Sequence, residues 1–222
     1  MPRLRFLALP IGCLAAPAIA GPQSDGQAWL NANAAGPIAG RLRASGEVTT
    51  RIGHASSGLY EVEMVALLGV DLGHGATLWG GFVHDPTYLD GHPIRTEERF
   101  REQVTAPLGT LAGGKLSGRM RIEQRWIDGR AGTGWRVRPW LRWSLPVART
   151  VALNLSHESF IDLNATGWGQ RAGYDRMRNT ITLSHPIARG VSLEGGYLNQ
   201  YSFRPGRDQI AHVATLALGY SW

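Results

Sequence analysis

The chain has 222 residues, including 29 glycines, 8 tryptophans and 6 tyrosines, and its formal net charge is +6. All of its 23 basic residues except Lys115 are arginine. After residue 20 no apolar run approaches the ~20 residues that a membrane-spanning helix needs, which excludes helical membrane proteins. The composition, with a single cysteine, also excludes coiled coils and disulfide scaffolds. An apolar content of 43% also argues against general disorder.

The N-terminus has the features of an export signal. Residues 2–5 are basic, residues 6–16 are largely apolar, and Ala18-Ile19-Ala20 is the small-x-small pattern that signal peptidase cuts. We predict a signal peptide over residues 1–20 with cleavage after Ala20. A rival interpretation makes Cys13, the single cysteine, a lipidation site, but the apolar stretch before it is short.

The rest of the chain is a succession of segments in which apolar and polar residues alternate with period two, separated by turns that contain glycine or proline. Most of these predicted strands have 10 to 14 residues, whereas strands in soluble sheets usually have about 5–6. A tilted strand that crosses a bilayer needs ~9–11 residues. The predicted strands are 27–34, 39–52, 58–71, 75–84, 97–107, 115–126, 133–145, 149–160, 174–185, 189–201 and 209–222.

The connections also alternate between two kinds. Residues 72–75, 146–148 and 186–190 are tight, whereas residues 85–96 and 161–173 are long and polar. Short turns on one side and long loops on the other are typical of bacterial outer-membrane barrels. We therefore predict an all-β fold, a single antiparallel transmembrane β-barrel, in preference to a soluble β-sandwich.

A barrel of antiparallel strands closes with an even number of them. Counting back from a periplasmic C-terminus makes 39–52 the first of about ten strands. Residues 21–38 then form an N-terminal segment outside the barrel, which spans residues 39–222. A twelve-stranded barrel, with one strand missed in the loops, is the alternative.

Arginines recur on one face of several predicted strands. A row of arginines is costly in a protein core, and on a lipid-facing surface each costs about 2–4 kcal/mol at mid-membrane. The same row is tolerated inside a barrel, where water and carboxylates reach it. We predict an interior charge network of Arg119, Arg121, Glu123, Arg125, Arg136, Arg138, Arg142, Glu158, Arg176, Arg178 and Glu194.

The last predicted strand ends in alternating apolar residues and a terminal aromatic residue. Leu216, Leu218, Tyr220 and Trp222 resemble the C-terminal signal that the barrel-assembly machinery recognises in outer-membrane proteins. We therefore expect a monomer in the outer membrane of a Gram-negative bacterium, with membrane lipid and lipopolysaccharide as its surroundings. The arginines are scattered rather than clustered and the 7 histidines are dispersed, so no nucleic-acid partner, metal site or cofactor is expected.

Several motifs along the mature chain resemble the family called domain of unknown function 2490. The family is similar to bacterial outer-membrane barrels and has no settled activity, so the resemblance implies fold and location but no reaction. This sequence departs from the usual pattern at residues 176–178, where a polar residue before a single arginine is commoner. The motifs are EERFREQ at 97–103, RMRIEQRW at 119–126, RVRPWLR at 136–142, HESF at 157–160, YDRMR at 174–178 and EGGYLNQY at 194–201.

One constellation supports an enzymatic hypothesis. His157 and Ser159 are two residues apart on a predicted strand, so both point to the same, lipid-facing side and the imidazole could activate the hydroxyl. The pair resembles the His-x-Ser pair of the lipid A deacylase barrel. That pattern continues with Asn-Ala and an acidic residue about a dozen positions later, whereas this chain has Phe160-Ile161 and then Gln170.

We therefore expect a structural or envelope role for a barrel whose interior is filled with charges, and an enzymatic role is not favoured. A narrow anion-preferring pore is the first alternative, because rings of arginine attract anions. A lipid A deacylase-like hydrolase that uses His157 and Ser159 is the second.

Overall fold

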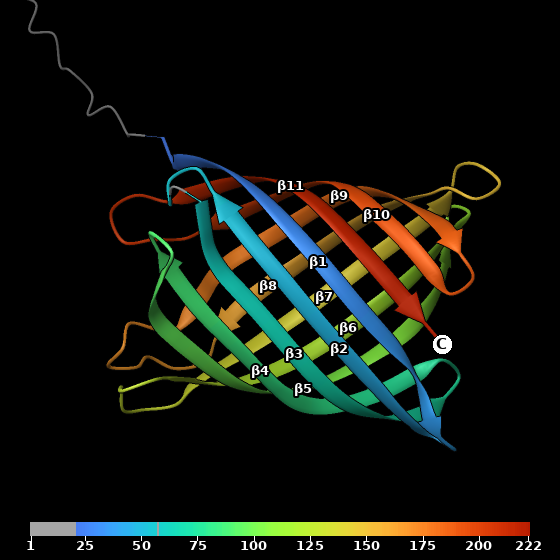
Figure 1. The fold of residues 1–222 in the computed structure, drawn as a ribbon, viewed down its shortest axis with the longest axis horizontal. Coiled ribbons are helices and arrows are strands. Elements are labelled where there is room, and N and C mark those ends of the chain that lie inside the picture. The colour runs from blue at the N-terminus through green and yellow to red at the C-terminus, as the bar shows by residue number, and fades with distance from the viewer. Residues whose placement is uncertain (1–20, 57) are drawn as a thin grey trace, which may run out of the picture.

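The computed structural model describes residues 21–56 and 58–222, and the predicted signal peptide lies outside them. The described residues form eleven β-strands, and none of them forms a helix long and apolar enough to cross a membrane. The strands, labelled in Figure 1, are β1 (Gln23–Ala39), β2 (Leu42–Gly53), β3 (Gly58–Gly73), β4 (Ala76–Leu89), β5 (His92–Leu111), β6 (Gly114–Ile127), β7 (Gly134–Pro146), β8 (Ala152–Asp162), β9 (Gly173–Ala188), β10 (Val191–Ser202) and β11 (Gln209–Ser221).

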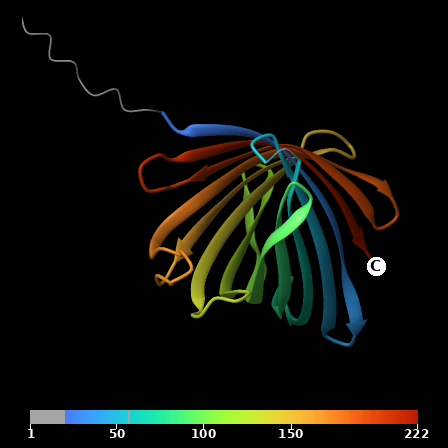
Figure 2. The same ribbon diagram turned by 60° about the vertical axis from the view of Figure 1, so that its left-hand side comes forward.

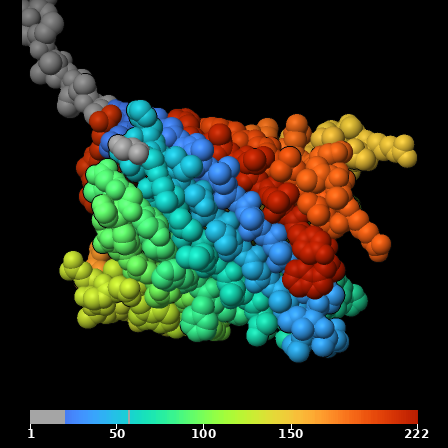
Figure 3. Space-filling model, viewed as in Figure 1, coloured from blue at the N-terminus to red at the C-terminus, as the bar shows by residue number. Residues whose placement is uncertain are grey.

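The strands close into one barrel. Each strand from β2 to β11 pairs antiparallel with its neighbour in sequence, and β1 lies between β2 and β11. β1 is antiparallel to β2 but parallel to β11, with a register that runs from Gln23↔Gln209 to Ala35↔Ser221. Figure 2 shows the strands curving around one barrel, and Figure 3 shows the blue surface of β1 between the cyan of β2 and the red of β11. The prediction of an all-β barrel is confirmed.

The predicted number of strands is corrected. The barrel has eleven strands instead of ten or twelve, because β1 covers most of the segment 21–38 that we expected outside the barrel. The even-number rule assumes that every pair of neighbours is antiparallel, and the parallel pairing of β1 with β11 removes that condition. The hydrophobic signal of β1 is also weak, because glycine and alanine hold most of its outward positions.

Two predicted loops are shorter than expected. β4 continues to Leu89 and β5 begins at His92, so the predicted loop 85–96 is mostly strand. The turn consists of Asp90 and Gly91, whose φ angles of 50° and 79° are those of a tight two-residue hairpin. β8 also continues to Asp162. Asp85 and Asp162, two of the polar residues that suggested loops, are buried at strand positions that face the barrel interior.

The barrel has two unlike ends, which we call the turn end and the loop end. The turn end carries two-residue turns at 40–41, 74–75, 112–113 and 189–190, the connection 147–151 and the C-terminal Trp222. The loop end carries the longer connections 128–133, 163–172 and 203–208 and the start of β1. In Figure 1 the turn end is at the right and the loop end at the left. Because the barrel has eleven strands, β1 starts at one end and β11 finishes at the other.

The distribution of apolar and charged residues between the inside and the outside is the reverse of that in a water-soluble protein. Large apolar side chains on the outer wall are exposed, among them Leu68 at 67% and Phe82 at 65%. Charged side chains that point inward are buried, among them Arg101 at 1% and Glu123 at 0%. Alternation along each strand produces both surfaces at once, since successive side chains point to opposite faces.

Close packing between strands requires glycine at some positions. A methyl group at Gly81 would collide with the backbone oxygen of Ala66 and would lie 2.8 Å from the Cα atom of Leu67. Backbone atoms of a paired strand cannot move aside without breaking the sheet. At Gly26 in β1, by contrast, a methyl group would have no atom within 4 Å.

We predict that Gly81→Ala destabilises the barrel by about 1–3 kcal/mol, the usual cost of overpacking. The purified protein in detergent should lose its fast-migrating, folded band on unheated gels at a lower temperature than wild type. Gly26→Ala is the matched control and should melt like wild type. Equal melting temperatures for Gly81→Ala and wild type would contradict the packing seen here.

Candidate functional sites

Inward-pointing side chains of strands that are not neighbours reach one another, because side chains converge on the concave face of a curved sheet. Arg99 on β5 contacts Glu63 on β3 at 2.9 Å, and Arg119 on β6 contacts Glu158 on β8 at 2.6 Å. Each of these pairs passes over an intervening strand. The barrel is therefore cross-linked from within by charged groups.

Glu123 on β6 is the most buried member of this network. Its Oε1 atom lies 3.0 Å from Arg101, 2.9 Å from Arg138 and 3.8 Å from Arg121. Arg138 also contacts Glu158, at 3.0 Å. One carboxylate thus faces three guanidinium groups from β5, β6 and β7, in a place where its own exposure is 0%.

A second group of ion pairs lies nearer the loop end. Glu97 on β5 contacts Arg99 at 2.5 Å and Arg125 on β6 at 2.7 Å. On the other side Asp162, at the end of β8, contacts Arg136 on β7 at 2.6 Å. Charge-assisted contacts of this kind are about twice as strong as neutral hydrogen bonds.

Two aromatic rings stand among the arginines. Phe160 on β8 is 2% exposed, and the guanidinium carbons of Arg138 and Arg178 lie 4.2 Å and 4.7 Å from its ring centre. The guanidinium carbons of Arg51 and Arg178 lie 4.5 Å and 4.6 Å from the ring centre of Trp29 on β1. Cation–π contacts of desolvated arginine are worth about 2 kcal/mol. They give Arg178 an interior partner although no carboxylate pairs with it among the described residues.

The structure places all eleven residues of the predicted network on the inner face. Most of them form an ion pair with a side chain of opposite charge. Arg142 on β7 pairs with Glu194 on β10 at 2.8 Å, and Arg176 pairs with its neighbour Asp175 at 2.6 Å. Arg121 and Arg178 depend mainly on Gln103 and Gln200, at 2.8 Å each.

Seven buried charged residues lie outside the predicted network. Asp85 was assigned to a loop and Asp162 lay just past the predicted end of its strand. The others share the alternation of neighbouring strands, so the same parity argument places them inside. The seven are Arg51, Glu63, Asp85, Glu97, Arg99, Arg101 and Asp162.

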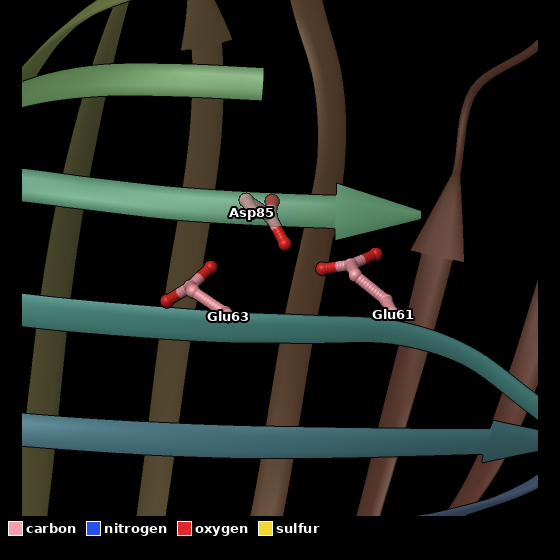
Figure 4. A group of neighbouring side chains, drawn as sticks. All are labelled: Glu61, Glu63 and Asp85. Atoms are coloured by element: carbon pink, nitrogen blue, oxygen red, sulfur yellow. The ribbon is translucent and has the colours of Figure 1, made fainter. Parts of the chain in front are cut away.

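Three carboxylates lie close enough together to resemble a metal site. Glu61 and Glu63 on β3 and Asp85 on β4 have oxygens within 4.8 Å of one another, and Figure 4 shows the three side chains close together on these two strands. Arg51 contacts both glutamates, and Arg99 contacts Glu63 and Asp85. Because guanidinium groups already supply the counter-charge, we assign these carboxylates to the ion-pair network.

A cavity of 580 Å³ opens at the loop end of the barrel. Its wall includes Trp168 and Gln170 of the connection between β8 and β9, and Gln170 accepts a hydrogen bond from Arg125 at 2.8 Å. Asp208 lies at the rim, where the hydroxyl of Tyr201 and the backbone N–H of Arg204 donate to its carboxylate. These hydrogen bonds lower the pKa of Asp208.

The outer wall carries a chain of four polar side chains on β8 and β9. His157 Nδ1 lies 2.7 Å from Asn179 Oδ1, and His157 Nε2 lies 2.9 Å from Ser159 Oγ. Ser159 Oγ in turn lies 2.7 Å from the hydroxyl of Tyr174. The sequence indicated His157 and Ser159 but missed the other two. Asn179 stands opposite His157 in the strand register, so a correct pairing of β8 with β9 would have located it.

Two other polar pairs lie on the same wall. His84 contacts Glu98 at 2.6 Å, and Tyr197 contacts His212 at 2.6 Å. Like His157, these residues lie three to six positions from the loop-end terminus of their strands. These pairs and His157 therefore lie between the middle of their strands and the loop end.

The four residues of the predicted assembly signal lie on the outer wall of β11. Leu216, Leu218, Tyr220 and Trp222 are exposed. The indole of Trp222 packs against Gly36 of β1, and its N–H donates to the backbone oxygen of Pro37 at 3.0 Å. The last residue of the chain thus holds β1 against β11.

We predict that Glu123→Gln lowers the free energy of unfolding by about 3–5 kcal/mol, because it leaves buried arginines without their shared counter-charge. The measurement is the melting temperature of the folded band in detergent. Glu102→Gln is the matched control on the outer wall, where Glu102 has no ion pair among the described residues, and should melt like wild type. A variant at position 123 as stable as its control would show that the interior pairs contribute nothing.

Comparison with known proteins identifies relatives without assigning an activity. Residues 26–211 match the model of the family described as "Protein of unknown function (DUF2490)". The chain is also 33% identical to an uncharacterized protein of Methylorubrum extorquens over 220 residues, which cover 97% of this chain and 96% of the relative. The matched segment runs from β1 into β11, and it confirms the resemblance noted in the sequence motifs. The chain belongs to the DUF2490 family.

Proposed function

We propose that the protein is a monomeric β-barrel of the bacterial outer membrane whose interior is filled by its own charged side chains. The observation that carries this proposal is the reversed distribution of residues, with apolar side chains exposed on the outer wall and arginine–carboxylate pairs buried inside. Water would disfavour such a wall, whereas hydrocarbon would match it. A closed barrel also leaves no strand edge with unpaired backbone groups in lipid.

The two ends support an orientation. Bacterial barrels have short periplasmic turns and longer external loops. The turn end would then face the periplasm, and the loop end would face the outside. The histidine-containing pairs of the outer wall lie between the middle of their strands and the loop end, on the side that would face lipopolysaccharide. The exposed aromatic end of β11 supplies the assembly machinery with the kind of signal that it recognises.

The proposed role is to stabilise the envelope rather than to pass solutes. Guanidinium–carboxylate contacts join β5 to β3, β6 to β8 and β7 to β10, so they reach over one or two intervening strands and occupy space inside the bore. A barrel of this strand number is also narrow. The cavity among the inner charges near Phe160 has a volume of 190 Å³, which leaves space for a few waters.

A narrow anion-preferring pore is the second candidate. Arg178 favours it, because its interior partners are an amide and two aromatic rings, and no carboxylate among the described residues pairs with it. A single measurement separates the two candidates.

We predict that the folded protein in a planar bilayer shows no discrete conductance steps, and that Glu123→Ala produces them or increases leak, because the network across the bore is broken. Folding of each sample is checked by its heat-modifiable gel band. Steps in the wild-type protein that prefer anions and disappear in Arg138→Ala or Arg142→Ala would replace the filled-barrel proposal by the pore.

The orientation has its own test with two cysteine variants. Asp90 and Ala112 are equivalent, since each is the first residue of a two-residue turn, has a positive φ and is followed by glycine. Asp90 is at the loop end and Ala112 at the turn end. The natural chain has one cysteine, in the predicted signal peptide.

In intact cells, a membrane-impermeant maleimide should label Asp90→Cys, whereas Ala112→Cys should react only after the outer membrane is permeabilised. The reverse pattern would invert the orientation. Labelling of both variants in intact cells, or of neither, would contradict the proposal that the barrel crosses the outer membrane.

A further inference from the structure

The polar chain on β8 and β9 is unusual because of its surroundings. His157, Asn179 and Tyr174 are exposed on a wall whose other large side chains are mainly apolar. In a nonpolar environment each unpaired polar group costs free energy, so a polar cluster there needs internal hydrogen bonds. The four side chains supply them to one another, in a line from Asn179 to Tyr174.

The hydrogen bonds have one consistent direction. Asn179 presents its carbonyl oxygen to Nδ1 of His157, so Nδ1 carries the proton and Nε2 is a free acceptor. The hydroxyl of Ser159 then donates to Nε2, and the hydroxyl of Tyr174 donates to Ser159 Oγ. This is the tautomer in which a histidine removes the proton of a serine nucleophile, with a third group orienting the ring.

A groove of 420 Å³ in the outer wall reaches the same histidine and serine. Its floor is made of small side chains, Ala106 and Gly118, which lie opposite each other on β5 and β6. Its sides are Leu108, Met120 and Leu141, which are all exposed apolar residues.

The groove also has a direction along the barrel. In the strand register Gly118 lies opposite Leu141, and Leu141 lies opposite His157. His157 is five residues from the loop-end terminus of its strand at Asp162, whereas Gly118 is nine residues from its own at Ile127. Gly118 is also only four residues from the turn-end terminus of its strand at Gly114. The groove thus begins at the serine and continues toward the turn end.

We propose that Ser159, His157 and Asn179 form a hydrolase centre on the outer wall that cleaves an acyl ester of a membrane lipid. This inference rests on the proposed location in the outer membrane. The occupant of the groove is the acyl chain of that lipid, because an apolar trough that ends at a nucleophile holds a hydrocarbon chain with its ester carbonyl beside Ser159. The polar remainder of the lipid extends toward the loop end.

The reaction has two balanced steps. Ser159 Oγ attacks the ester carbonyl carbon while its proton passes to His157 Nε2; the bond from that carbon to the alcohol oxygen then breaks, and His157 returns the proton to the leaving alkoxide. Water next attacks the acyl-serine, His157 takes a proton from it, and the bond to Ser159 Oγ breaks as the serine regains its proton. The products are a free alcohol on the lipid and a fatty acid.

The other two residues have distinct roles. Asn179 is a positioning residue that holds the imidazole in the required tautomer. Tyr174 donates to Ser159 Oγ at rest and, when Oγ becomes bonded to the substrate, its hydroxyl is the nearby side-chain donor for the oxygen that gains negative charge. Removing one such donor commonly lowers kcat by about 10²–10³-fold.

The first test uses a fluorophosphonate probe and 4-nitrophenyl laurate on the folded, full-length mature protein in detergent. Wild type should be labelled and should hydrolyse the ester, and Ser159→Ala and His157→Ala should lose labelling and at least about 10³-fold in kcat. His212→Ala is the matched control, because it removes an outer-wall histidine that is bonded to a tyrosine, and it should keep both signals. A heat-modifiable band shows that each variant is folded.

Asn179 is tested by substitution and rescue. Asn179→Ala should lower kcat more than it changes KM, because the imidazole loses the acceptor that orients it. Asn179→Asp should retain most of the activity, since a carboxylate oxygen accepts the same hydrogen bond from Nδ1. A kcat in Asn179→Ala equal to that of wild type would overturn the role of Asn179 beside the histidine.

The groove is tested by filling it. Gly118→Leu should raise KM for the laurate ester at least tenfold and should affect hydrolysis of 4-nitrophenyl acetate much less, because a short acyl group does not reach position 118. The atoms nearest to a Cβ at position 118 belong to the flexible side chain of Leu108. Equal losses for both esters would overturn the assignment of the groove.

The outcomes separate this inference from the proposed function. A folded protein that fractionates with outer membranes but is neither labelled nor active, or a Ser159→Ala variant as active as wild type, overturns the hydrolase and leaves the barrel in place. A labelled, active protein recovered only in the periplasm would support the serine centre and overturn the membrane location.

Discussion

The pairing of arginine with carboxylate inside the barrel is the interaction on which the rest of the structure depends. Strand alternation places every second side chain inside, and many of those positions hold charged groups that pair with one another. Breaking such a buried pair is costly because it leaves a charge without a partner. The network therefore holds non-neighbouring strands together, and it imposes directional constraints that a ring of aliphatic side chains would lack.

The parallel pairing of β1 with β11 has a second structural consequence. It adds one strand to a set of ten antiparallel ones, so the first and last strands begin and finish at opposite ends of the barrel. Trp222 packs over Gly36 at this seam, and Trp29 of β1 receives two arginines on the inside. The seam is thus secured on both faces by aromatic rings.

The inner and outer faces can serve different purposes because alternation makes them nearly independent. The interior network can give stability, while Ser159 and its partners lie on the other face of the same strands. Glu158 between His157 and Ser159 illustrates this division, since it points inward to Arg119 and Arg138. The three-residue motif therefore supplies one residue to the network and two to the outer wall.

Period-two alternation, strand lengths and the row of arginines were enough to predict an all-β barrel, the approximate bounds of its strands and the inward direction of the eleven charged residues, because these depend on local geometry. The parallel closure by β1, the partners of each arginine, and the approach of Asn179 and Tyr174 to His157 and Ser159 were decided only by the tertiary structure. They depend on which strands become neighbours and in what register, and a pattern that repeats every two residues is the same in every register that differs by two.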